Sequence, residues 1–229
     1  MSDKNRSEPV SLWLQAHSEA EVLTTLRDQC ASKKATAHQL KLYAQVLLKL
    51  HKFKEFAQLS PRLIKAQSFD ETQWDWALRT YFGSDSVTTL QQRNADLPKQ
   101  LRSGGHTHYL RAMVRVGEIA SVQDELKKLL KRSEYSQLLS ILSEIEFGNA
   151  EELQKALQSE LKKQPDEPEM LLSLAYLAQS QGEHELASRV FDKVLAQQQR
   201  LPHPQRAMLS YRATRQAEKA LLVHDHSHP

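Results

Sequence analysis

The sequence is poor in residues that interrupt helices. It contains six glycines and eight prolines among 229 residues, which leaves little room for β-hairpins or long loops. Hydrophobic residues make up 40% of the chain and charged residues 26%, enough for the continuous but thin core that paired helices form. This composition predicts a fold that is almost entirely α-helical.

Cysteine is nearly absent. Cys30 is the single one, so no disulfide can form within the chain, and a reducing compartment is favoured. Cys30 shares an apolar stripe at helical spacing with Val22 and Leu26. This pattern predicts a packed thiol rather than a nucleophile.

Long apolar runs are also missing. No stretch is long enough to cross a bilayer, and the first nine residues lack the apolar core of a signal peptide, so we expect a soluble, cytoplasmic chain without direct membrane insertion. The formal net charge is +3, from 31 lysines and arginines against 28 aspartates and glutamates. The densest basic stretch, 127–132, is interrupted by leucines at helical spacing and not by aromatic residues, so we expect no nucleic-acid binding.

The glycines that are present recur at a regular spacing. Gly83, Gly117, Gly148 and Gly182 are separated by 34, 31 and 34 residues, and a turn at 50–52 precedes them. Each break lies between two amphipathic stretches, which is typical of helix–turn–helix repeats near the tetratricopeptide period of about 34 residues. We predict an all-α, tetratricopeptide-like solenoid of about five helix pairs with terminal capping helices, an architecture that presents an extended surface.

The predicted organisation has three parts. Residues 1–17 form a disordered or short helical arm, 18–200 the repeat array, and 201–229 a capping helix with a disordered, histidine-containing tail. Arginines of the cap, including Arg212, are expected on its outer, solvated face, where they keep the last repeat soluble.

Capping and breaking residues predict individual helix ends. Ser68 with Glu71 fits a capping box, and Gly83 is expected to end the next helix with a positive φ. Pro61 should kink or split its helix, because proline lacks an amide donor and clashes one turn back. The stretch 103–105, Ser-Gly-Gly, is the expected weak joint.

Later in the chain, Ser133 and Asn149 are the expected N-caps of two further helices. In the fifth pair, Ala175 and Ala187 are small so that two helices can approach closely, and Phe191 fills the space beside their contact.

Three segments resemble one family in order and spacing. They are YLRAMVRVGE at 109–118, FGNAEELQKAL at 147–157 and PDEP at 165–168, followed by Gly182 and Phe191. Together they resemble the C-terminal tetratricopeptide region of the HemY family, over roughly residues 36–198.

The resemblance implies a non-enzymatic scaffold of a bacterial inner membrane that is associated with haem or porphyrin metabolism and has haem-pathway proteins as partners. It does not imply the flavin-dependent oxidase that shares the family's name. HemY proteins usually begin with two membrane-spanning helices, which this sequence lacks. We therefore expect either a portion of an anchored protein, held at the cytoplasmic membrane face, or a shorter relative without the anchor.

Polar residues on the first helix of each pair are the predicted partner-binding surface, because that helix lines the concave side of such an array. They are Lys41, Gln45, Lys49, Arg111, Arg115, Tyr176 and Gln179. Their cationic share predicts a protein partner with an acidic segment or a chain terminus.

No catalytic constellation is visible. The chain has no Gly-rich phosphate loop, no zinc-protease motif and no pairing of a cysteine with a histidine. Its paired carboxylates at 124–125 and 151–152 are expected near helix N-termini, where negative charge interacts favourably with the helix dipole. We therefore predict that the chain is not an enzyme.

Histidines are the remaining candidates for a metal or cofactor. His224, His226 and His228 alternate in the tail and are weak metal ligands, because nothing there fixes their geometry, so we expect no metal and no cofactor. Two alternatives to the haem-linked scaffold stay open. A haem-binding carrier would use His38 or His108, and a general assembly scaffold would serve envelope or secretion machinery.

Overall fold

The computed structural model describes residues 17–227, apart from the side chains of 103 and 225–227. Within this range the chain is all-helical, with 13 helices, no strand and 78% of its residues in helix, so the predicted all-α class is confirmed. Nearly all of the predicted N-terminal arm and the last two residues of the tail lie outside the described residues. No helix of the described range has the length and apolar character needed to cross a membrane.

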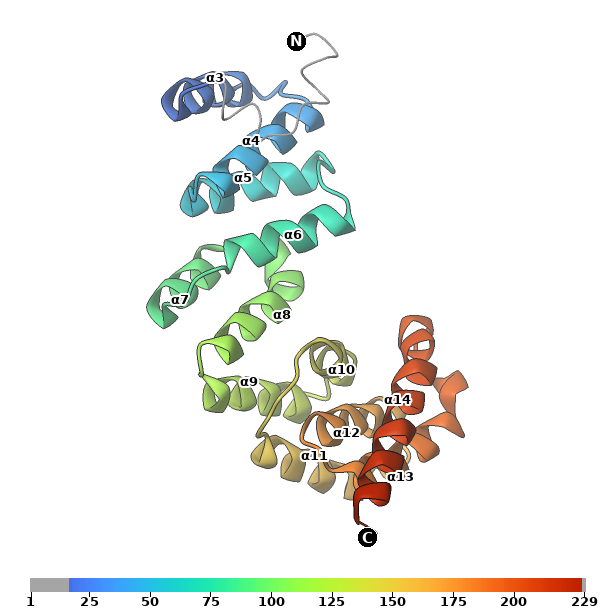
Figure 1. Cartoon of the computed structure of the whole chain (residues 1–229). Coiled ribbons are helices and arrows are strands. Elements are labelled where there is room, and N and C mark those ends of the chain that lie inside the picture. The colour runs from blue at the N-terminus through green and yellow to red at the C-terminus, as the bar shows by residue number, and fades with distance from the viewer. Residues whose placement is uncertain (1–16, 228–229) are drawn as a thin grey trace. The chain divides into compact units, whose positions relative to one another are not determined.

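The chain divides into two compact units, Met1–Val116 and Gly117–Pro229, and each is described by itself. The helices that the structure describes in unit 1 are α3 (Glu19–Ala31), α4 (Ala37–Lys49), α5 (Phe53–Lys65), α6 (Glu71–Tyr81), α7 (Val87–Asp96) and α8 (Lys99–Arg115). Helices in alternate positions pack together, α4 with α6, α5 with α7 and α6 with α8 (Figure 1). Aromatic rings fill the core between them, with the Tyr81 ring 5.6 Å from Phe56 and 4.9 Å from Phe82.

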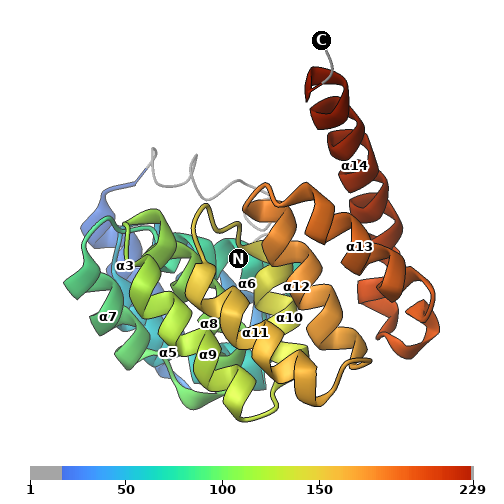
Figure 2. The same ribbon diagram turned by 90° about the horizontal axis from the view of Figure 1, so that it is seen from below.

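Unit 2 is built around one buried helix. Its elements are α9 (Ile119–Lys131), α10 (Tyr135–Glu144), α11 (Glu151–Lys163), α12 (Pro168–Ser180), α13 (His184–Leu195), a 3₁₀ turn (Gln198–Arg200) and α14 (His203–Ser227). Helix α12 packs against α10, α11 and α13, and α14 packs against α13. The C-terminal turns of α14 extend beyond the other helices of the unit (Figure 2).

Several helix ends differ from the sequence prediction. Helix α6 is capped by Asp70, whose Oδ1 accepts from the Gln73 amide at 2.8 Å, and not by Ser68. Ser68 instead belongs to the turn after α5, where Gln67 has a φ of 51° and the Ser68 amide donates to the Leu63 carbonyl at 3.0 Å. The predicted Ser68–Glu71 capping box is therefore wrong, because Ser68 belongs to the turn after α5 and Asp70 takes the N-cap position of α6.

Gly83 does not end α6 with a positive φ. Helix α6 ends at Tyr81, and the following Phe82 has a φ of −95° and enters the core. A positive φ occurs at Gly117 and Gly182, where glycine adopts it easily. It also occurs at His51 and Ser133, which are not glycines. The regular spacing of turns therefore does not require glycine at each of them.

The predicted caps at Ser133 and Asn149 are also wrong. Ser133 has a φ of 59° in the turn before α10, so it cannot take the extended conformation of an N-cap. Backbone amides at the start of α11 donate to side chains of neighbouring helices instead. Gln181 accepts from the Ala150 amide at 2.8 Å, and Gln123 accepts from the Leu153 amide at 3.2 Å.

The stretch 103–105 is not a joint, because α8 runs through it without interruption. Gly105 is buried, and a Cβ there would lie 3.2 Å from Leu97 Cδ1 and 3.7 Å from Leu78 Cδ2. The glycine thus permits α8 to pack closely against α6 rather than bending the chain.

Pro61 does not split its helix either, since α5 continues from Phe53 to Lys65. Proline cannot donate to the carbonyl of Ala57, four residues earlier. The buried hydroxyl of Ser60 donates to that carbonyl at 2.6 Å. A neighbouring side chain thus replaces the backbone bond that the proline removes.

A double-mutant cycle can test whether the Ser60 hydroxyl replaces the missing backbone donor at Pro61. Ser60→Ala leaves the Ala57 carbonyl without a donor and should lower the free energy of unfolding by about 1–3 kcal/mol. In a Pro61→Ala background, the new amide donates to Ala57 and the same change should cost less than half as much. Urea denaturation of the four proteins measures both values, and equal costs in the two backgrounds would contradict the explanation.

The contact between α12 and α13 gives a second stability prediction. Ala187 is fully buried in α13, so Ala187→Trp should overpack this contact and destabilise the protein by about 1–3 kcal/mol. Glu185→Trp places the same ring at an exposed position of α13 and is the matched control. Denaturant midpoints that are equal for the two variants would show that the contact is not tightly packed.

Candidate functional site

The predicted partner-binding residues of α4 share one helix face. Lys41, Gln45 and Lys49 follow each other at four-residue spacing, with Lys49 exposed and the other two half-buried. None of them lines the hollow of unit 1 that is formed by Leu40, Arg62 and Lys65. Their role in binding stays a prediction.

The two arginines of α8 that were predicted to bind a partner contact other residues of unit 1. Arg115 donates to the backbone carbonyls of Phe82 at 3.2 Å and Ser84 at 2.8 Å, and its Nε lies 3.8 Å from Asp85 Oδ1. It therefore holds the turn that follows α6. Arg111 Nη1 lies 3.4 Å from His108 Nδ1.

The histidine candidates are not brought together as a ligand set. His108 lies on α8, 3.5 Å from Asp75 Oδ1, and His38 is half-buried in the first turn of α4. His224 is exposed on α14, which also contains the backbone of His226, and His228 lies outside the described residues. Among the residues that the structure describes, no group of three or more His, Cys, Asp or Glu could hold a metal.

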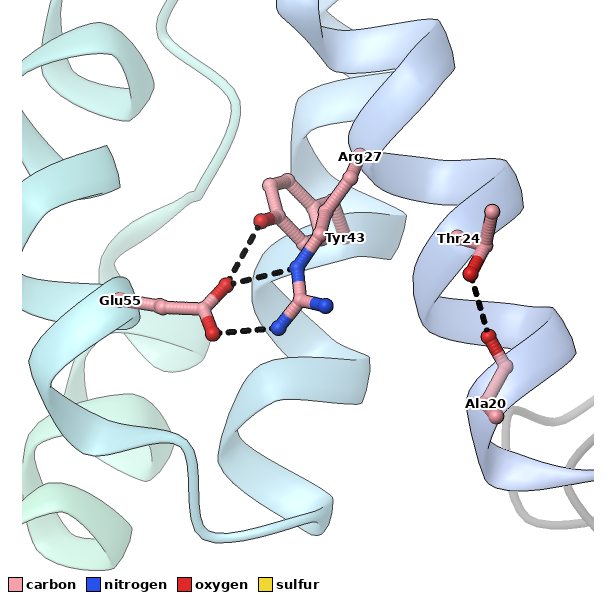
Figure 3. Close-up of polar contacts among 5 residues, drawn as sticks. All are labelled: Ala20, Thr24, Arg27, Tyr43 and Glu55. Carbon is pink, nitrogen blue, oxygen red and sulfur yellow. Dashed lines mark hydrogen bonds and ion pairs between the residues drawn. The ribbon is translucent and has the colours of Figure 1, made fainter.

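A charged cluster joins α3, α4 and α5 of unit 1 (Figure 3). Arg27 of α3 binds both carboxylate oxygens of Glu55 on α5, at 3.1 Å and 2.5 Å, and the Tyr43 hydroxyl of α4 donates to Glu55 at 3.0 Å. The hydrogen bond from Arg27 is the main cause that lowers the pKa of Glu55 below its ordinary value. The Arg27 cation is already paired with the Glu55 carboxylate and the Tyr43 hydroxyl already has an acceptor, so the cluster fastens helices rather than offering a site.

A more open arrangement lies in unit 2, where α10, α12 and α14 enclose a pocket of about 220 Å³ that we call the α14 pocket. Its walls combine apolar, cationic and uncharged polar side chains with a single acidic residue. They are Leu142, Ile145, Glu146, Tyr176, Gln179, Ser180, Met208, Tyr211, Arg212, Arg215 and Lys219. Two of the predicted binding residues, Tyr176 and Gln179, belong to this set.

Tyr176 lies deeper than the sequence predicted. Its side chain is 2% exposed and packs against Phe191, with ring centroids 6.1 Å apart. The expectation that Tyr176 is presented freely at the surface is wrong, because α14 covers this face of α12. The hydroxyl is buried and has no hydrogen-bond partner within residues 17–227.

Arg212 comes from α14 and lies over the Tyr176 ring, with Cζ 4.6 Å from its centroid. Its Nη2 also donates to the backbone carbonyl of Ser143, at the end of α10. Arg212 is therefore directed inward, and the prediction that it belongs to a solvated outer face is wrong. Burial raises the pKa of Tyr176, and the nearby Arg212 cation partly opposes this shift.

Glutamine side chains hold α14 in place beside the pocket. Gln179 donates from Nε2 to the Arg212 carbonyl at 3.2 Å. Gln216 is 1% exposed, and its Nε2 donates to the His184 carbonyl at 3.1 Å. Gln179 thus holds the backbone of Arg212, so its side-chain amide is partly occupied within unit 2.

The rim of the pocket carries the cations that remain available. Arg215 is exposed and Lys219 is half-buried, and within the described range neither forms an ion pair or a hydrogen bond. Met208 and Tyr211, 38% and 67% exposed, lie on the same helix face by spacing. Sequence reasoning missed this role of α14, although the pattern of 208, 211, 215 and 219 at three- and four-residue steps already indicated one mixed apolar and cationic stripe.

A second hollow of unit 2, of about 560 Å³, lies between α11, α12 and α13. Four leucines and a valine are among its eleven lining residues, including Leu171, Leu186 and Val190. No side chain with an unpartnered buried polar atom faces it in the described residues. The α14 pocket is therefore the better candidate for specific recognition.

Comparison with known proteins adds no relative, because no family model, curated protein or solved structure matches the chain. The resemblance to HemY proteins therefore stays a prediction.

The Arg27–Glu55 cluster gives a prediction for the pH dependence of stability. The lowered pKa of Glu55 means that its contribution is fully present above the ordinary glutamate pKa of about 4.3 and is lost as pH falls through the lower folded value. Glu55→Gln should therefore destabilise the protein more at pH 7 than at pH 3. Urea denaturation across this range measures the difference.

Asp28→Asn is the matched control, because Asp28 is an exposed carboxylate of α3. Its stability difference from the wild type should change less with pH than that of Glu55→Gln. A pH-independent cost of Glu55→Gln would show that the ion pair does not stabilise unit 1.

Proposed function

We propose that this chain is a non-enzymatic, tetratricopeptide-like scaffold that binds a segment of a partner protein in the α14 pocket. The observation that carries the proposal is the pair of cations without ion pairs, Arg215 and Lys219, beside the exposed side chains of Met208 and Tyr211. A partner segment with both carboxylates and apolar side chains complements this combination.

The arrangement of the helices supports the repeat assignment. In unit 1, alternate helices pack together, and in unit 2 the same relation holds between α9 and α11 and between α10 and α12. Ala175 and Ala187 are fully buried where α12 meets α13, as close approach of a helix pair requires. Contacts of this kind are typical of arrays in which each element packs only on its neighbours.

The size of the α14 pocket favours a peptide over a cofactor or a large substrate. Its volume of about 220 Å³ lies below the range of about 300–1,000 Å³ that is common for small-molecule sites. The cationic and apolar stripe continues beyond the pocket along α14 to Leu222, which is also exposed. A short hollow beside an extended helix face suits one anchoring group of a longer chain.

The HemY resemblance suggests which proteins to test first. It implies partners among the proteins of haem or porphyrin metabolism, with the scaffold at the cytoplasmic face of a bacterial inner membrane. A general assembly scaffold for envelope or secretion machinery would use the same pocket with other partners. The two are separated by the identity of the protein that contacts α14.

The test is photo-cross-linking in the source cell, with p-benzoylphenylalanine in place of Tyr211. We expect a discrete adduct that disappears when Arg215→Glu and Lys219→Glu are introduced together. With the purified partner, this double reversal should weaken binding by at least about tenfold. Fluorescence anisotropy of the labelled partner segment measures this change.

Two controls make the result specific. The cross-linker at Lys155, an exposed position of α11, should not give the same adduct. Lys128→Glu with Lys155→Glu reverses two exposed charges of unit 2 outside the pocket and should leave binding within about twofold. Equal losses from both double reversals, or adducts that do not depend on Arg215 and Lys219, would overturn the proposal.

A further inference from the structure

We infer that the Tyr176 hydroxyl and the Arg212 guanidinium form a buried carboxylate-binding subsite at the base of the α14 pocket. The inference rests on the proposed function and names the chemical group that anchors the partner. It applies to a carboxylate from the end of a chain or from an aspartate or glutamate side chain.

The first support is the unused hydroxyl of Tyr176. It is buried in the wall of the pocket and forms no hydrogen bond to any residue between 17 and 227. Buried polar groups in native proteins are nearly always hydrogen-bonded, because an unmade bond lowers stability. Phenylalanine would fill the same space without this cost, so the hydroxyl is better explained by a bond that forms when a ligand is present.

The second support is the position of Arg212. Its guanidinium lies over the Tyr176 ring and uses one donor on the Ser143 carbonyl, its single hydrogen bond from the side chain among the described residues. A guanidinium has five N–H donors, so others remain for a ligand. A carboxylate drawn to this cation comes close to the ring whose hydroxyl lacks an acceptor.

The base of the pocket is also preorganised. Tyr176 lies on the buried helix α12, and Gln179 of the same helix holds the Arg212 backbone at 3.2 Å. Gln216, one turn further along α14, is bound to α13. Because both groups lie on packed helices, little ordering is needed before a ligand binds.

The chemistry of the walls selects an acceptor with a single negative charge. Tyr176 and Arg212 are donors, and Arg215 and Lys219 add positive charge at the rim. A carboxylate offers acceptors only and matches a guanidinium with two parallel bonds. Glu146 also lines the pocket and repels additional negative charge, which favours a carboxylate over a phosphate dianion.

Burial also affects the protonation of the Tyr176 hydroxyl. It raises the pKa of Tyr176 above its ordinary value, which itself lies well above neutral pH, so the hydroxyl is a donor at neutral pH and stays one at higher pH than usual. The same exclusion of water strengthens a hydrogen bond to a charged acceptor.

The experiment is an NMR titration of the full chain and of Tyr176→Phe. The probes are N-acetyl-leucine for a chain end, the α-amide of N-acetyl-glutamate for a side-chain carboxylate, inorganic phosphate, and N-acetyl-leucine amide as the uncharged control. At least one carboxylate should shift the signals of Tyr176, Gln179 and Arg212 in a saturable manner, more strongly than phosphate or the amide. The stronger of the two carboxylates identifies the source of the group.

Tyr176→Phe should weaken this carboxylate binding about tenfold, as expected for loss of a hydrogen bond to a charged group. Thermal unfolding of the free variant should occur at the same temperature as in the wild type or above it, because an unpaired buried hydroxyl is removed. Tyr135→Phe changes a tyrosine of unit 2 outside the pocket and should alter neither binding nor these three signals. The combination of weaker binding and retained stability is not expected of a residue with a purely structural role.

The inference is overturned if no carboxylate gives saturable shifts, if the amide binds equally, or if Tyr176→Phe binds as the wild type does. These failures leave the proposed function intact, provided that the cross-link at Tyr211 still depends on Arg215 and Lys219. Conversely, carboxylate binding that depends on Tyr176 without any cross-linked partner would support the subsite and contradict the scaffold.

Discussion

The nearly complete burial of α12 is the constraint on which the rest of unit 2 depends. Ten of its 13 residues are buried, because α10, α11 and α13 each pack against it. A helix that is apolar on almost all sides has to place its few polar groups against neighbours or at a gap between them. Ser173 donates to the Glu169 carbonyl at 2.8 Å, whereas Tyr176 lines the pocket beside α14 and its hydroxyl has no partner in the described chain. The pocket thus follows from how the core is packed.

Helix α14 then decides what this gap can bind. One of its faces is fixed to the unit through Leu209 and Gln216, both of which are buried. The neighbouring face carries Arg212 inward and Arg215 to the rim, so a single helix supplies cations at two depths. An arginine elsewhere in the chain can instead be occupied by contacts within its own unit. Arg115, for example, is exposed, yet it donates to two backbone carbonyls of its own unit.

The sequence was sufficient for the class of fold and for most helices, because local periodicity determines which residues face inward. It was insufficient where the outcome depends on distant residues. Gly105 reads as a flexible joint until Leu97 and Leu78 are seen beside it, and Ser60 explains how α5 tolerates Pro61. For the candidate site, Tyr176 and Gln179 could be selected from helical spacing. Their burial could not, because it depends on α14, which lies about 30 residues further along the chain.

The contrast between two charged clusters shows why the α14 pocket, and not a more conspicuous ion pair, is the candidate site. In the cluster of Arg27, Tyr43 and Glu55, the cation is paired with a carboxylate and the hydroxyl has an acceptor, so a ligand carboxylate would have to displace Glu55. At Tyr176 and Arg212 no carboxylate of the described chain pairs with the guanidinium, and the hydroxyl has no hydrogen-bond partner there. Such an imbalance lowers the stability of the free protein and is relieved by a ligand that brings an acceptor. A buried hydroxyl without an acceptor beside a cation without a carboxylate, rather than the net charge, therefore distinguishes the candidate site from the structural cluster in this chain.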